Sequence, residues 1–63
     1  MRMSDLRFGD TVTARLFGGE IVTGTIDGFG EKNDRDLIDI NPENGVLRWC
    51  YLDQIISVNG VQV

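Results

Sequence analysis

The stretch from Leu16 to Phe29, with the sequence LFGGEIVTGTIDGF, constrains the fold of this chain more than any other segment. One face of the expected strand alternates between branched apolar residues and glycine: Val22, Gly24, Ile26 and Gly28. Glycine weakens a strand, so its repeated use indicates a sharp bend or a close backbone approach. A short antiparallel sheet closes on itself only if its longest strand bends. We therefore predict a small β-barrel with a strongly bent second strand, entered through a two-residue turn at Gly18-Gly19.

The rest of the chain contains segments typical of short strands. Four are predicted: Thr11 to Phe17, Leu37 to Ile40, Val46 to Tyr51 and Ile55 to Val58. The polar stretch from Gly30 to Asp36 predicts a mobile loop, and Leu52 to Gln54 a single helical turn. Asn59-Gly60 is a hairpin signal after which Val61 to Val63 can fold back as a short final strand. Residues 1–63 are thus predicted to form one all-β domain, a five-stranded antiparallel barrel.

Size and cysteine content indicate association with another chain. A chain of 63 residues buries a small core, which by itself gives only a few kcal/mol of stability. One cysteine and no histidine exclude an internal disulfide and disfavour a zinc site. Self-association is the remaining way to add stability to so small a core, so we expect a homo-oligomer.

Charge and hydropathy limit the classes of partner. Six basic and ten acidic residues give a net charge of −4, which disfavours DNA and anionic membranes as partners. No apolar run approaches a membrane-spanning helix of about 18 residues, and the N-terminus lacks the apolar core of a signal peptide. Together with the unpaired cysteine, these features predict a cytoplasmic protein.

Two segments carry a resemblance to a known family. The positions Leu16, Gly19, Gly24, Ile26 and Phe29 match the first motif of the Sm-like family, which includes the bacterial Hfq proteins, and VLRWCYLDQIISV (46–58) is similar to its second motif. The resemblance implies an SH3-like/Sm-like barrel, ring assembly by pairing of edge strands, and RNA binding by loops. Gly30, however, stands where the family places an acidic residue, and the turn 51–54 carries Asp53 in place of basic residues.

Two sets of contact residues follow. Ile55, Ile56 and Val58 form an apolar strand whose edge we expect to pair with another copy, and Phe17 lies on the wet face of the first strand. For the alternative of an RNA-binding ring protein in RNA regulation or chaperoning, the candidate contacts are Asn33, Arg35, Arg48 and Tyr51. Trp49 and Tyr51 are expected to face the core, where Trp49 would meet Phe29.

No residue pattern indicates catalysis, a metal or a cofactor. Four acidic residues lack calcium-loop spacing and are interpreted as solvated: Glu31, Asp34, Asp36 and Asp39. Asp27 and Asp53 lack an accompanying nucleophile, and Cys50 is interpreted as a buried apolar residue. FGDTV also resembles plasmid-encoded type II dihydrofolate reductases, but LRWCY replaces their Val-Gln-Ile-Tyr run. The leading hypothesis is a non-catalytic module that acts through protein contacts.

Overall fold

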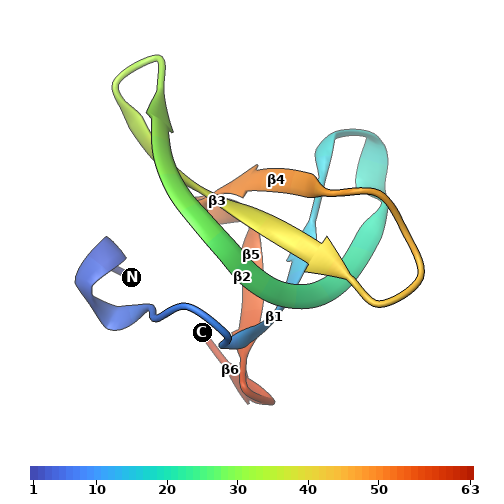
Figure 1. Ribbon diagram of the computed structural model, residues 1–63. Helices are drawn as coiled ribbons and strands as arrows, with labels where there is room; N and C mark the ends of the chain where they lie inside the picture. The colour runs from blue at the N-terminus through green and yellow to red at the C-terminus, as the bar shows by residue number, and fades with distance from the viewer.

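Six strands form a single antiparallel sheet in the computed structural model, which describes residues 1–63 (Figure 1). The strands are β1 (Thr11–Arg15), β2 (Ile21–Lys32), β3 (Arg35–Pro42), β4 (Arg48–Tyr51), β5 (Ile55–Val58) and β6 (Val61–Gln62). Their hydrogen-bonded order is β4-β3-β2-β1-β5-β6, so β4 and β6 are the two edges and the sheet does not close through hydrogen bonds. The all-β prediction is confirmed, with six strands rather than five. Short 3₁₀ turns lie at Met3–Asp5, Phe17–Gly19 and Leu52–Gln54, and no helix is long and apolar enough to span a membrane.

β2 curves through the centre of the sheet and contains an irregularity where it bends (Figure 1). Its pairing with β3 shifts register between Ile26 and Gly28, which leaves Asp27 as an extra residue of the kind found in a β-bulge. Gly24 lies against the end of β3, because a Cβ atom built on it would stand 2.6 Å from the carbonyl oxygen of Asn41. The glycine thus permits a close approach of two backbones.

The predicted mobile loop from Gly30 to Asp36 is wrong. Both strands continue through this stretch, and only Asn33 and Asp34 form the turn, with φ of 56° and 60°. Asn and Asp tolerate this left-handed conformation, which a tight hairpin turn requires at both positions. The stretch is polar because this arm of the hairpin projects beyond the core, as Figure 1 shows at the upper left.

The connection between β1 and β2 is longer than the predicted two-residue turn. It spans Leu16 to Glu20, where the Leu16 N–H donates to the Glu20 carbonyl at 2.8 Å and the Gly19 N–H to the Leu16 carbonyl at 3.0 Å. Gly18 has φ 85° and ψ −3°, the third-position conformation of a type II turn. Because the turn begins at Leu16, it places Phe17 at the tip of the loop.

The predicted free edge at Ile55 to Val58 is wrong. β5 pairs with β1 on one side and with β6 on the other, through Ser57↔Gln62 and Val58↔Val61. The Asn59-Gly60 turn, with φ of 50° and 81°, folds the chain back over that edge. Beyond β6, the Val63 N–H donates to the Ile56 carbonyl at 3.0 Å.

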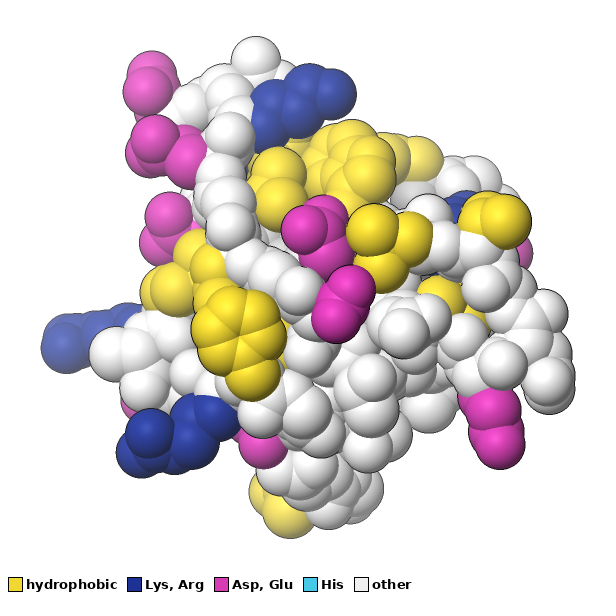
Figure 2. All heavy atoms as spheres, viewed as in Figure 1, with side chains coloured by type: hydrophobic (Ala, Val, Ile, Leu, Met, Phe, Trp, Pro, Cys, Tyr) yellow, Lys and Arg dark blue, Asp and Glu magenta, His cyan; other side chains and the backbone are white.

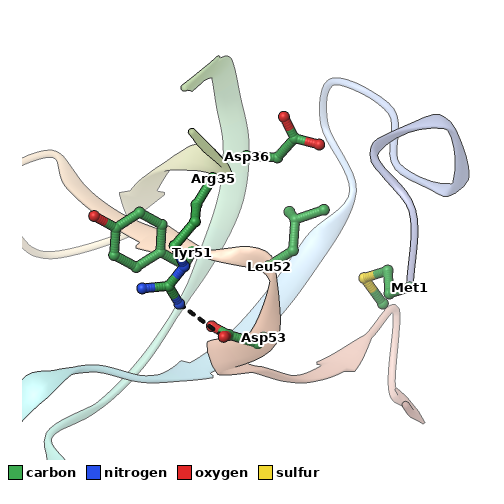
Figure 3. A pocket seen from close by; sticks show the side chains of 6 residues that line it. All are labelled: Met1, Arg35, Asp36, Tyr51, Leu52 and Asp53. Carbon is green, nitrogen blue, oxygen red and sulfur yellow. Dashed lines mark hydrogen bonds and ion pairs between the residues drawn. The ribbon is translucent and has the colours of Figure 1, made fainter. Parts of the chain in front are cut away.

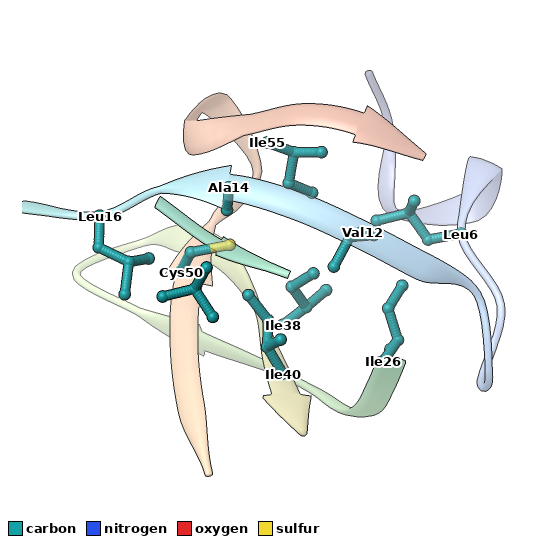
Figure 4. Close-up of a cluster of buried hydrophobic side chains, with 10 residues drawn as sticks. Leu6, Val12, Ala14, Leu16, Ile26, Ile38, Ile40, Cys50 and Ile55 are labelled. Carbon is teal, nitrogen blue, oxygen red and sulfur yellow. The ribbon is translucent and has the colours of Figure 1, made fainter. Parts of the chain in front are cut away.

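The core lies between the curved halves of the sheet (Figure 4). Its largest fully buried side chains are those of Ile38, Ile40, Val12 and Cys50. Cys50 pairs with Ile38 across β3 and β4, so these two side chains share the inner face and Trp49 lies on the other. The prediction that Trp49 meets Phe29 in the core is wrong, because Trp49 is 38% exposed and Phe29 packs edge-to-face on Phe8 at 4.9 Å.

Cys50 is expected to be chemically inert in the folded protein. Burial raises the pKa of its thiol from 9.0 to about 11, so very little thiolate is present at pH 8. Because the folded pKa exceeds the unfolded one, this thiol favours folding below pH 9 and that contribution is lost as the pH rises towards 11. Labelling with a disulfide reagent should follow global unfolding in denaturant. Rapid labelling of native protein would contradict the buried position.

Candidate functional site

Three aromatic side chains form a cluster on the sheet face opposite the core. This aromatic cluster consists of Phe17 from the β1–β2 connection and Trp49 and Tyr51 from β4. The Tyr51 ring lies 5.2 Å from that of Trp49 and 6.2 Å from that of Phe17, both edge-to-face. Phe17 is 73% exposed and Trp49 is 38% exposed, whereas Tyr51 is buried between them. An aromatic ring as exposed as Phe17 is a ready anchor for a partner.

Two cations from the β2–β3 hairpin lie on these rings. The Lys32 ammonium is 4.9 Å from the centre of the Trp49 ring, and the Arg35 guanidinium is 3.7 Å from that of Tyr51. Cation–π attraction favours both placements. Arg35 also forms an ion pair with Asp53 at 2.7 Å, which Figure 3 shows at the edge of an open pocket of about 300 Å³. The guanidinium therefore covers one face of Tyr51 and is partly neutralised.

Tyr51 is fixed by polar contacts at both ends. The Asn33 side-chain N–H donates to its hydroxyl at 3.2 Å, because the tight hairpin turn holds Asn33 close to β4. Its backbone N–H donates to the Gln54 side chain at 2.8 Å, across the 3₁₀ turn that follows β4. The cluster thus has a rigid base in Tyr51 and an exposed rim in Phe17 and Trp49.

Arg48 borders the aromatic cluster, because it lines a small hollow with Phe17 and Trp49, but its charged group is paired with a carboxylate. Its guanidinium donates to both carboxylate oxygens of Glu20, at 2.7 and 3.0 Å. The hydrogen bond and charge of Arg48 lower the pKa of the Glu20 carboxyl, and the bond to Glu20 raises the pKa of Arg48. Of the four predicted RNA contacts, the structure therefore brings Asn33, Arg35 and Tyr51 together. The fourth, Arg48, is paired with the Glu20 carboxylate instead.

The residues predicted to form an oligomer interface also lie in different environments in the structure. Ile55 belongs to the core, Ile56 and Val58 are half-buried, and only Phe17 is widely exposed. Sequence reasoning missed Trp49 as a surface residue, because its strand alternates between two sets that are both partly apolar. It also missed Leu47, which is 54% exposed and precedes β4. No signal within the strand distinguishes the two sets, and the inner face is identified only by the pairing of Cys50 with the buried Ile38 of β3.

Acidic side chains interrupt the hydrophobic surface in the view of Figure 2. Figure 2 shows separate hydrophobic groups with acidic side chains between them and a basic side chain beside the uppermost group. No group of three His, Cys, Asp or Glu side chains is placed to hold a metal ion. The aromatic cluster and the cations on it can offer aromatic contacts and paired charges to a partner.

Comparison with models of protein families, with curated proteins and with solved structures finds no match to this chain.

Proposed function

We propose that this protein is a non-catalytic binding module that acts through protein contacts and forms a homo-oligomer through the aromatic cluster. The observation that carries the proposal is Phe17, a large apolar side chain 73% exposed beside the partly exposed Trp49. Such aromatic anchors contribute most of the binding energy at protein interfaces. The small core also supports the proposal. A core cluster of ten buried residues gives limited stability by itself, so association would stabilise the folded chain further. The free thiol of Cys50 supports a reducing, cytoplasmic setting.

The proposed fold family is the Sm-like group within the SH3-like barrels. Support comes from the close backbone approach at Gly24 and from the 3₁₀ turn Leu52–Gln54 between β4 and β5. In the proposed barrel, the β2 bend brings β4 towards the β1–β2 connection, where Phe17 and Tyr51 already meet.

Replacing Phe17 with lysine is expected to shift the assembly to monomers. The change removes an apolar anchor and introduces charge into the contact, which costs at least about 2 kcal/mol per interface. Sedimentation equilibrium at micromolar to millimolar concentration measures the mass of the parent and the variant. Val61→Lys is the matched control, because Val61 is 69% exposed on the opposite edge strand. A parent that sediments as a monomer, or a Phe17→Lys protein that still assembles, contradicts the proposal.

The second candidate function is binding of single-stranded RNA by an Sm-like ring. The observation that favours it is the gathering of Lys32, Arg35 and Asn33 around two aromatic rings, since bases stack on such surfaces. Titration of uridine-rich and adenine-rich RNA at two salt concentrations tests it. Saturable binding that weakens with salt and is lost in Trp49→Ala favours RNA. Absence of binding at low salt would contradict the RNA-binding function and favour the function through protein contacts.

A further inference from the structure

The first three residues of β2 have a strand partner on one side only. β1 pairs with all of them, from Arg15↔Ile21 to Thr13↔Thr23. β3 begins to pair with β2 only at Gly24↔Pro42, because the chain turns away at residues 43–45. The sheet therefore has a free internal edge at residues 21–23, in addition to the outer edges of β4 and β6.

The backbone groups of Ile21 and Thr23 point towards this free side. Hydrogen bonds from Leu16 N–H to Glu20 C=O and from Ile26 N–H to Asp10 C=O fix the phase of the β1–β2 ladder. Hydrogen-bonded pairs alternate in an antiparallel ladder, so Val22 and Gly24 are the residues that bond to β1. The N–H and C=O groups of Ile21 and Thr23 are thus directed away from β1, where no strand accepts them.

An open slot lies along this edge, between β2 and the β3–β4 connection. Its volume is about 470 Å³, and its two walls are residues 20–23 on one side and 42–46 with Arg48 on the other. Ile21 is 50% exposed on the first wall and Val46 is 78% exposed on the second. A slot with unpaired backbone groups along one wall and apolar side chains on both has the properties of a strand-addition site.

The charges in the slot favour a cationic occupant. Glu20 is engaged by Arg48, whereas Glu43 is exposed and makes no ion pair or side-chain hydrogen bond. The protein as a whole carries a net charge of −4. A basic side chain on the incoming segment would pair with Glu43 and reduce the overall repulsion.

We propose that this slot binds an extended segment of a partner protein, which adds as a short strand beside Ile21–Thr23 and places a Lys or Arg side chain at Glu43. Three residues of such a strand span about 10 Å. The slot lies across the Glu20–Arg48 ion pair from the aromatic cluster, so the inference does not depend on the function proposed for that cluster.

The probe is a blocked pentapeptide, Ser-Val-Lys-Val-Ser, titrated into the full chain and followed by amide NMR and hydrogen exchange. Binding in the range of about 1 mM is expected, because the contact is short. Shift changes should centre on residues 20–23 and 43–46, with exchange of the Ile21 and Thr23 amides slowed about tenfold at saturation. The same peptide with Glu in place of Lys should bind about three- to fivefold more weakly.

Ile21→Pro removes an N–H that β1 does not use, at the first residue of a strand, where proline is tolerated. This variant should keep the parent spectrum of the core and lose peptide binding, whereas the matched Ile21→Val should bind as the parent does. Glu43→Gln provides a second variant that leaves the backbone intact and should remove the preference for Lys over Glu. Shift changes confined to Trp49 and Tyr51, or none at all, would overturn the inference. Protection of Ile21 and Thr23 that rises with protein concentration alone would also overturn it, and would assign the slot to a second copy.

Discussion

Replacing Gly24 with alanine is expected to cost at least about 3 kcal/mol and to leave most of the protein unfolded at room temperature. The added Cβ would stand 2.6 Å from the Asn41 carbonyl oxygen, 2.7 Å from its carbon and 2.8 Å from the Pro42 nitrogen. All three are backbone atoms, so no side chain can rotate away and β2 must separate from β3. Urea unfolding followed by circular dichroism measures the loss.

Gly45→Ala is the matched control for this substitution. Its Cβ would lie 3.6 Å from the Pro42 side chain, an ordinary contact, and its φ is not positive. The control should therefore lie within about 0.5 kcal/mol of the parent, or be slightly more stable, because alanine restricts the unfolded chain. Equal effects of the two substitutions would contradict the close approach at Gly24.

Ile38→Ala is expected to cost about 3 to 4 kcal/mol. Ile38 is fully buried at the middle of β3, where it packs against the inner side chains of the neighbouring strands. Removing three carbon atoms leaves a cavity that the surrounding strands cannot fill, because β3 is held by β2 on one side and β4 on the other. The melting temperature should fall by about 15 °C or more.

Leu47→Ala tests whether this cost comes from burial. Leu47 is 54% exposed, so its truncation should change the free energy of unfolding by less than about 0.5 kcal/mol. A comparable loss of stability in both variants would mean that Leu47 also packs in the core, as its strand's apolar pattern suggested.

The sequence predicts the strands best where one face is clearly polar. The alternation of Val12 and Ala14 with Thr11 and Thr13 predicts the inner face of β1 correctly, since both apolar residues are fully buried. Where both faces are partly apolar, as in β4, pattern alone does not decide. There the pairing of Cys50 with Ile38 on β3 determines the face, and the residues of β4 alone do not reveal this pairing.

The β2–β3 arm is unpredictable from its sequence for a different reason. Its residues contribute nothing to the core, so neither hydrophobic alternation nor an apolar anchor marks them as strands. Only the Asn33-Asp34 pair carries a local signal, and it is weaker than Asn-Gly or Asp-Gly. The surface of the aromatic cluster depends on this arm, because Lys32, Arg35 and Asn33 all come from it. The sequence named Asn33, Arg35 and Tyr51 as contact residues but could not show that they meet.

The strand order also determines when the chain can complete its fold. Four of the five strand pairings join neighbours along the chain, and each can form as a local hairpin. The exception is β1 with β5, where Val12 pairs with Val58. The β1–β5 pairing therefore closes a longer loop than any of the hairpins and carries the largest single loop-closure entropy, so we expect it to form after them. Asn59 stabilises the contact between the start of β1 and the end of β5, since its side chain accepts a hydrogen bond from the Thr11 N–H at 2.9 Å and donates one to Asp10 at 3.1 Å.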